Sequence, residues 1–201
     1  MDRRQKKTRQ AIIDACFDLM KSKDLHHITI NDIAEKADIN RGTFYLHFED
    51  KYDMMKQFEN EMIGKLEAVF RENLPTENFN QEFLPSRYDT LIEILQCFKD
   101  NQKLMQLFLQ SNHINSFEKK LQEKMLFLVG DEFSEFIERL NISIPKEVLV
   151  VVFTSVYIGL VKYSYTSEDE LDIEKTADYI FKIVLQGPAK VMGFYEGSVA
   201  K

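Results

Sequence analysis

The segment from Thr29 to Lys51 constrains the fold more than any other, because its apolar spacing predicts two short helices joined by a tight turn. The first helix has apolar residues at the three- and four-residue spacing of one helix face, namely Ile30, Ile33, Ala34 and Ala37. Thr29 is placed to cap the free amides of this helix. Residues 38–40 interrupt the pattern, Ile39 is expected to point inward, and Asn40 can cap a second helix that starts at Arg41. The pattern is that of a helix-turn-helix.

The second helix has one side for the core and one side for a partner. Phe44 and Phe48 lie four residues apart, so they share a face and are expected in the core. The opposite side carries Gly42, Thr43, Tyr45 and Leu46. Because the second helix of a helix-turn-helix enters the major groove of DNA, these side chains are candidates for DNA contact. For Tyr45 and His47 the alternative is an exposed ring on an ordinary three-helix bundle.

At this point the chain resembles a known family. The run IAEKADINRGTFYLHFEDK, from Ile33 to Lys51, is similar to the signature of the TetR-type bacterial transcriptional repressors, and the resemblance covers roughly the first 55 residues. The family implies a further helix before the pair, and a matching apolar stripe between Thr8 and Lys23 consists of Ile12, Ile13, Cys16, Phe17, Leu19 and Met20. Two positions depart from the family pattern, since Asp38 stands where Gly is common and Asn40 where Ser is common. Both residue types tolerate left-handed or capping conformations.

The resemblance also implies roles for individual side chains. The DNA backbone would be contacted by Thr29, Asn31, Thr43, His47 and Lys51. Base edges or thymine methyl groups would be contacted by Arg41, Gly42, Tyr45 and Leu46. Arg41 is the candidate for reading a guanine. Gly42 has no Cβ, so it would let the start of the helix approach the duplex closely.

The charge distribution favours DNA binding at the N-terminus. The first 50 residues hold 9 basic and 9 acidic side chains, so the net charge of −7 lies entirely in the remainder of the chain. Within these 50 residues, positive charge is concentrated at the start, in Arg3, Arg4, Lys6, Lys7 and Arg9. We expect a basic arm suited to phosphates or to a minor groove. A solvated, disordered tail is the alternative, and the two are compatible.

The rest of the chain predicts an all-α architecture without an internal repeat. Residues 1–50 are expected to form a three-helix helix-turn-helix DNA-binding domain, and residues 51–201 a larger helical domain for effector binding and dimerisation. Asp50 can cap a long helix over residues 51–73 that connects the two, and a loop is expected between Pro75 and Pro85. Further helical segments are expected at residues 88–98, 104–109, 114–140, 146–165 and 170–186, and a short NISI stretch precedes Pro145.

The last two of these segments are candidates for a dimer interface. Residues 146–165 are apolar nearly all round, so neighbours must cover more than one face of this helix. In the family the last two long helices form the dimer interface, and a twofold dimer would present two reader helices to a near-palindromic operator. The candidate interface residues are Val152, Ser155, Gly159, Tyr163, Ala177, Ile180, Phe181 and Val184. A purely intramolecular core is the alternative.

The middle helices are candidates for an effector pocket, because family members usually bind a small molecule there and then release DNA. An aromatic and methionine-rich set could line an apolar pocket: Phe98, Met105, Phe108, Met125 and Phe127, with Leu109 and Phe133 beside them. For each of these residues core packing is the stronger expectation.

Several other classes of protein are disfavoured. The chain lacks phosphate-cradling glycine loops, a GxSxG turn and an HExxH pair, so an enzyme is not expected. The adjacent His26 and His27 lack further ligands at metal spacing, and no metal or other cofactor is expected. The longest nearly apolar stretch, residues 148–161, is too short for a membrane span, and two cysteines with a polar start favour a reducing cytoplasm. The remaining alternative is a helical protein-interaction module, or a regulator controlled by a partner protein.

Overall fold

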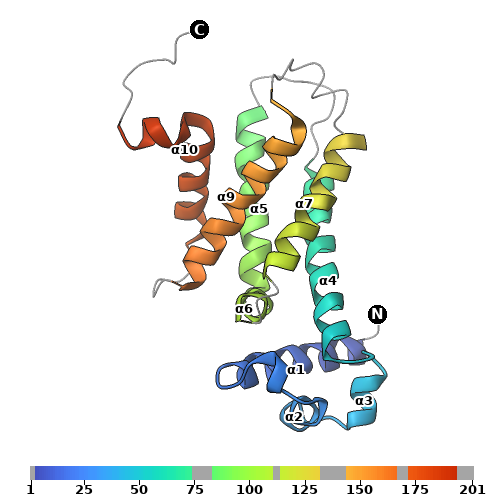
Figure 1. The fold of residues 1–201 in the computed structure, drawn as a ribbon. Coiled ribbons are helices and arrows are strands. Elements are labelled where there is room, and N and C mark those ends of the chain that lie inside the picture. Colours follow the sequence, from blue (N-terminus) through green and yellow to red (C-terminus); the bar gives the residue numbers. More distant parts are fainter. Residues whose placement is uncertain (1–2, 74–82, 111–113, 132–143, 167–171, 194–201) are drawn as a thin grey trace. The chain divides into compact units, whose positions relative to one another are not determined.

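The computed structural model describes residues 3–73, 83–110, 114–131, 144–166 and 172–193. Every regular element in these ranges is a helix (Figure 1), which confirms the all-α prediction. The first 50 residues contain α1 (Arg3–Met20), the short 3-10 helix η1 (Leu25–His27), α2 (Ile30–Lys36) and α3 (Arg41–Tyr45), and α2 and α3 are called the reader helices. The remaining helices are α4 (Lys51–Glu72), α5 (Phe83–Asp100), α6 (Gln102–Gln110), α7 (Ile114–Asp131), α9 (Lys146–Thr166) and α10 (Ile173–Val191).

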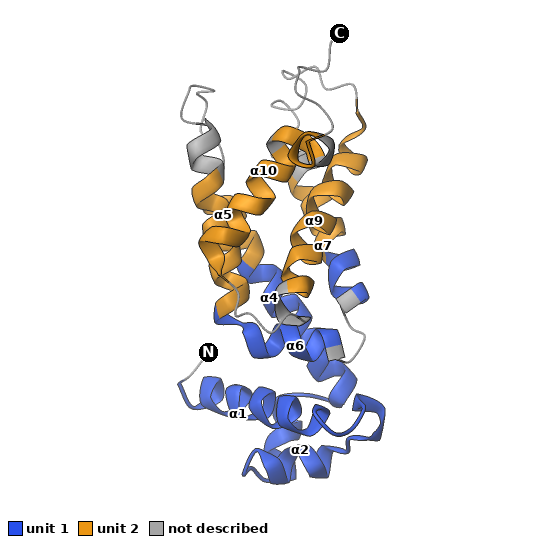
Figure 2. Ribbon diagram, turned by 90° about the vertical axis from the view of Figure 1, so that its left-hand side faces the viewer, with its two compact units in different colours: residues 1–65, 100–120 blue, residues 66–99, 121–201 orange. Residues whose placement is uncertain are grey.

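The chain forms two compact units, coloured separately in Figure 2. Unit 1 contains residues 1–65 and 100–120, and unit 2 contains residues 66–99 and 121–201. Unit 1 therefore includes α6 and the start of α7 in addition to the reader helices. The domain boundary expected at residue 50 stays a prediction.

The core of unit 1 is built around α1, which packs against α2 and α6. Its apolar stripe is buried as expected, with Ile12 and Cys16 fully enclosed. Unit 1 also buries side chains of α4, which are Met54, Met55, Phe58, Met62 and Ile63, and of α6, which are Leu104, Met105, Leu107 and Phe108. The first helix begins at Arg3 rather than near Thr8, because Arg, Gln and Lys all favour helix and nothing before Thr8 stops it.

Unit 2 has a core of apolar side chains from α5, α9 and α10 and from the end of α7. It contains Leu91, Ile94, Leu95, Phe98, Leu128, Val150, Ile158, Val161, Ala177 and Ile180. The contact between α9 and α10 belongs to this unit. Gly187 interrupts α10 with φ 76° and ψ 152°, a left-handed value that glycine adopts without steric cost.

The start of α5 differs from the sequence prediction. Pro85 lies in the first turn of α5 instead of in a loop, where its missing amide proton costs nothing because first-turn amides have no helical partner. The segment expected over residues 114–140 is helical to Asp131, and residues 132–143 lie outside the described ranges. The helix expected over residues 170–186 ends where it was predicted to end, at the break at Gly187, and a second helical segment follows to Val191.

The described residues also lack the features of two other classes of protein. None of the helices in those ranges has the length and apolar character needed to cross a bilayer. In the same ranges no three His, Cys, Asp or Glu side chains come together as a metal site.

Candidate nucleic-acid interface

The first reader helix, α2, starts at a reciprocal cap. The Thr29 hydroxyl oxygen accepts a hydrogen bond from the amide of Asp32 at 3.1 Å, and the Asp32 carboxylate accepts one from the amide of Thr29 at 2.8 Å. The second of these bonds is the main reason that the pKa of Asp32 is lowered. Two free amides of the helix end are thus satisfied, which confirms the predicted capping role of Thr29. Asn31 follows in the first turn and is exposed.

The turn between α2 and α3 depends on a left-handed residue. Asp38 has φ 53°, and the amide of the following Ile39 donates to the Ala34 carbonyl at 3.0 Å. Asp38 occupies the position where the family commonly has glycine, and an aspartate tolerates this conformation better than most residues do. Ile39 is half-buried. The turn therefore closes without glycine, as the sequence predicted.

The orientation of α3 is fixed from one side. Asn40 accepts a hydrogen bond from the Gly42 amide at 2.9 Å and caps the helix as predicted. Phe44 and Phe48 are both buried, and their ring centroids lie 5.4 Å apart. Phe48 also lies 5.4 Å from Phe58 of α4 in an edge-to-face contact. These contacts confirm that the two phenylalanines belong to the core and hold α3 against α4.

The opposite side of α3 is open to solvent. Leu46 is 84% exposed and Tyr45 is 45% exposed. Arg41 and Gly42 are exposed as well, whereas Thr43 is half-buried. A Cβ at Gly42 would meet only the Asn40 side-chain oxygen at 3.5 Å, an ordinary contact. Packing within the chain therefore does not require a glycine at this position.

His47 lies beside a buried arginine. The pKa of His47 is lowered, first because the ring is partly buried and second because the positive charge of Arg9 is nearby. The Arg9 guanidinium lies over the rings of Phe48 and Phe58, at 4.6 and 5.5 Å from their centroids. It donates to Gln57 at 3.2 Å and forms an ion pair with Glu61.

Arg9 therefore does not belong to the expected basic arm. It is 7% exposed, because it lies on the apolar stripe of α1, three residues before Ile12 and seven before Cys16. This spacing predicts burial, whereas the charge of Arg9 alone suggests a place in the basic arm. A guanidinium is suited to such a place because it stacks on aromatic rings.

Lys51 has a different environment from the one that the resemblance implied. Its ammonium group donates to three backbone carbonyls, those of Leu25 at 2.7 Å, His26 at 2.8 Å and Ile28 at 2.9 Å. An ammonium group has three N–H donors, so all of them are used. In this structure Lys51 joins the start of α4 to the carbonyls at the end of η1, and it has no donor left for a phosphate.

The remaining basic candidates lie at the start of α1. Arg3, Arg4, Lys6 and Lys7 are exposed on its first two turns. They form part of a helix and not a separate arm, which corrects that expectation. Their exposure keeps them available to phosphates.

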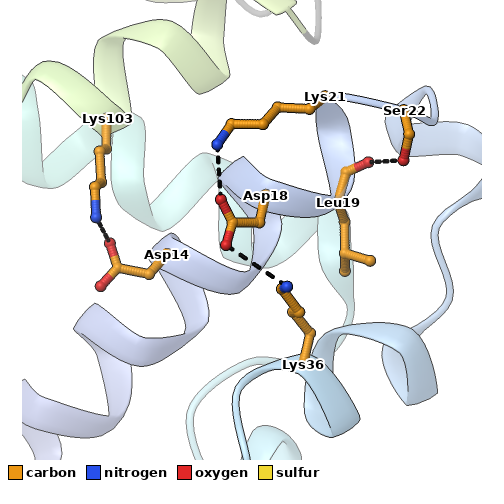
Figure 3. Close-up of polar contacts among 7 residues, drawn as sticks. All are labelled: Asp14, Asp18, Leu19, Lys21, Ser22, Lys36 and Lys103. Carbon is orange, nitrogen blue, oxygen red and sulfur yellow. Dashed lines mark hydrogen bonds and ion pairs between the residues drawn. The ribbon is translucent and has the colours of Figure 1, made fainter.

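Lysines near the other end of α1 are neutralised by acids (Figure 3). Lys103 of α6 lies 2.7 Å from Asp14, and Asp18 pairs with Lys21 at 2.9 Å and with Lys36 at 3.7 Å. These exposed pairs contribute little stability, but they reduce the local positive charge. Among the described residues, the cations of α1 that are not seen paired with an acid are therefore those of its first turns.

The residues proposed for an effector pocket divide between the two units. Met105 and Phe108 belong to unit 1, where Phe108 stacks on Phe117 with centroids 5.3 Å apart. Phe98, Met125 and Phe127 belong to unit 2. All are buried except Phe127, which is 56% exposed and lies under the ammonium group of Lys124. The burial agrees with the core-packing alternative, and Phe133 lies outside the described residues.

The residues proposed for a dimer interface also divide into two groups. Val152, Ser155, Gly159 and Tyr163 are exposed along one stripe of α9. Ala177 and Ile180 are buried within the chain, at 0% and 1% exposure, so placing them at an interface was wrong. Phe181 packs edge-on against Tyr88 of α5 with centroids 5.3 Å apart, and Phe181 and Val184 are half-buried. The helix α10 thus uses its apolar stripe mainly for its own unit.

The comparisons with known proteins agree with this geometry. A family model described as bacterial regulatory proteins of the tetR family matches residues 12–58, and one described as a transcriptional regulator C-terminal region matches residues 86–186. Among curated relatives, the uncharacterised HTH-type transcriptional regulator YxbF of Bacillus subtilis is 25% identical over 57% of this chain and 30% of its own length. The dhaKLM operon transcriptional activator DhaS of Lactococcus lactis is 38% identical over 27% of this chain and 29% of its own length. The matched regions span about a third of the curated relatives.

Solved structures share the whole fold. NalD, the secondary repressor of the MexAB-OprM multidrug efflux pump in Pseudomonas aeruginosa, superposes with a TM-score of 0.65 over 90% of this chain and 97% of its own, at 20% identity. The fatty acid degradation regulator FadR from Bacillus halodurans gives a TM-score of 0.65 over 90% and 96%, at 15% identity. At these identities the likeness concerns the fold alone.

A capped helix pair whose second helix keeps one side open, on an otherwise helical body, defines a DNA-binding transcriptional regulator of the helix-turn-helix class. With both family models matching, the chain belongs to the TetR family of bacterial regulatory proteins.

Proposed function

We propose that the protein is a homodimeric, one-component repressor that binds a palindromic DNA operator through α3 of each copy and is released by a small apolar effector. The observation that carries the proposal is that α3 and the turn after it have a buried side, formed by Phe44 and Phe48, and an open side on which Leu46 is 84% exposed. The open side offers a guanidinium, a phenol ring and an aliphatic side chain to the base edges of a major groove. Thr29, Asn31, Thr43 and His47 would contact the backbone beside it, with help from the cations of the first turns of α1.

Dimerisation is supported by α9. Val148, Val152, Ser155, Gly159 and Tyr163 recur every three or four residues and are all exposed. The two small residues in the middle of this stripe permit a close approach between helices, and three valines of α9 are about half exposed. An apolar stripe of this kind is expected to be covered, and a twofold copy of the same helix covers it symmetrically.

Release by an effector is supported by the course of α4. This helix starts beside the reader helices in unit 1 and ends in unit 2. An effector that binds more tightly to the arrangement that is unable to bind DNA would shift the population away from the operator. FadR and NalD are named as regulators of fatty acid degradation and of a multidrug efflux pump, which fits an apolar effector for this chain. The curated relative DhaS is named as an activator, so activation of transcription is the alternative to repression. Control by a partner protein is the alternative to release by a small-molecule effector.

The test of DNA binding is a gel-shift titration with the DNA upstream of the protein's own gene, at several salt concentrations. The affinity is expected to fall steeply as salt rises, because phosphate contacts release counterions, and an unrelated duplex should bind far more weakly. Arg41→Ala should weaken binding to the upstream DNA, whereas Lys56→Ala removes an exposed positive charge from α4 and should have little effect. Equal, weak binding to both duplexes by the unmodified chain would contradict the proposal and favour a protein-interaction module.

A further inference from the structure

Two exposed residues of α3 contact each other. The Arg41 guanidinium donates a hydrogen bond to the Tyr45 hydroxyl at 3.0 Å, and its central carbon lies 5.4 Å from the centroid of the Tyr45 ring. The residues are four apart, so they occupy neighbouring turns of one helix face. The guanidinium is therefore attached to the tyrosine by a hydrogen bond and by a cation–π contact.

The Tyr45 ring is itself held by the core. It meets the ring of Phe44 edge to face, with centroids 5.9 Å apart and an interplanar angle of 89°. Phe44 is fully buried and cannot shift without opening the core of unit 1. A chain of contacts thus runs from the core through Phe44 and Tyr45 to the exposed guanidinium.

This chain of contacts has a consequence for base recognition. A free arginine side chain loses rotamer freedom when it binds a base, and a side chain that is already oriented loses less. Arginine has five N–H donors, and the bond to Tyr45 uses one of them. A planar pair of donors remains for the O6 and N7 acceptors of a guanine, which is the commonest specific arginine contact in a major groove.

We propose that Tyr45 is the positioning residue for Arg41, and that the two side chains read a single guanine as one unit. The inference rests on the proposed function of α3 as the DNA reader, and it assigns Tyr45 a task other than a base contact of its own. Removing the tyrosine hydroxyl should then relax discrimination at the same base pair that Arg41 reads.

The experiment uses the full-length protein and a duplex that it selects from a pool of random double-stranded oligonucleotides. Each base pair of the selected duplex is then varied in turn, and the affinities of the variants are measured for the unmodified chain, Arg41→Ala, Tyr45→Phe and the double variant. Arg41→Ala should lose about tenfold or more of the discrimination at one base pair. Tyr45→Phe should lose about threefold to tenfold at that same position, and the double variant should be no worse than Arg41→Ala alone.

Matched controls separate positioning from general damage. Tyr52→Phe removes the hydroxyl of a comparably exposed tyrosine, which lies 3.2 Å from Nδ1 of His26, and should leave the discrimination profile unchanged. Arg41→Lys keeps the charge but lacks the planar pair of N–H donors. The salt dependence of the affinity should therefore persist, while discrimination at the base pair is lost. All variants should unfold at the same temperature as the unmodified chain, within about 2 °C.

Three outcomes would overturn the inference. Tyr45→Phe could leave the position read by Arg41 unchanged, it could relax a different position, or its effect could add fully to that of Arg41→Ala. Failure to select any duplex would be a different result, since it would contradict DNA reading by α3 itself and hence the proposed function.

Discussion

The helices α3 and α9 both expose side chains, but they do so in opposite ways. On α3 the exposed groups include a guanidinium and a phenol, and a cap, a left-handed turn and two buried rings fix the helix beneath them. On α9 the exposed stripe is valine, serine, glycine and tyrosine, and the buried stripe of Val150, Thr154, Ile158 and Val161 belongs to unit 2. A hydrated, charged partner suits the first surface, and a second apolar surface suits the other. The chemistry of the exposed side of a helix therefore indicates the class of partner that it binds.

The largest effect is expected from placing a charge on the apolar stripe of α9. Val152→Glu should convert the dimer to a monomer, because a carboxylate buried against its symmetry copy has no compensating partner. Light scattering after size-exclusion chromatography should show half the mass, and operator affinity should fall by about 100-fold or more because two half-sites no longer bind together. Lys175→Glu changes an exposed charge on α10 and is the control. An unmodified chain that is monomeric at micromolar concentration would contradict the proposal that the exposed stripe of α9 forms a dimer interface.

The next effect concerns Lys51, which joins the start of α4 to the carbonyls at the end of η1. Lys51→Met should lower the free energy of unfolding by about 2 kcal/mol, since three backbone carbonyls lose their charged donor. Denaturant titration measures this loss, and Lys56→Met on the same helix should cause little. The slope of log affinity against log salt should stay unchanged. If the slope instead fell by about 0.9 while the stability stayed the same, Lys51 would contact a phosphate, as the family resemblance implies.

A smaller effect is expected at Asp38, in the turn between α2 and α3. Asp38→Gly should raise the free energy of unfolding by about 0.5 kcal/mol, because glycine adopts a φ of 53° with less steric cost. Asp24 has φ −63° and its side chain makes no capping hydrogen bond, so Asp24→Gly is the matched control and should be destabilising. Thermal unfolding of both variants measures the difference. A stabilisation at both positions would mean that the left-handed conformation is not the cause.

The smallest expected effect is a pH dependence of the stability that arises at His47. Burial and the charge of Arg9 lower the pKa of His47 below 6.5 in the folded protein, so the unfolded chain takes up a proton more readily. The stability contributed by neutral His47 is present above pH 6.5 and is lost as the pH falls through the lowered folded-state pKa. Unfolding temperatures measured between pH 7.5 and pH 5 should therefore fall less for His47→Gln than for the unmodified chain. The exposed His27→Gln is the control, and an equal effect of both changes would remove His47 from this role.

The features that the sequence predicted correctly are local ones. The caps at Thr29, Asn40 and Asp50 each join groups two or three residues apart, and all three exist in the structure. The burial of Phe44 and Phe48 follows from their four-residue spacing. Residue type and periodicity determine such features, so one sequence is enough to predict them.

The features that it did not predict depend on distant groups. The carbonyls that bind Lys51 lie 23 to 26 residues away, and the glutamate that pairs with Arg9 lies 52 residues away. The apolar stripe of α10 was correctly identified, but whether its own chain or a second copy covers it is a tertiary question. Ala177 and Ile180 are covered by their own unit, and periodicity alone cannot distinguish the two cases.

The composition of unit 1 has a consequence for exchanging DNA specificity between relatives. Because α6 packs against α1 and supplies Leu104, Met105, Leu107 and Phe108 to the same core, a fragment cut at residue 50 would lose much of the apolar surface that keeps it folded. A chimaera that transplants only the first 50 residues therefore inherits mismatched neighbours. Engineers who want a portable reader should transfer residues 100–120 together with residues 1–65.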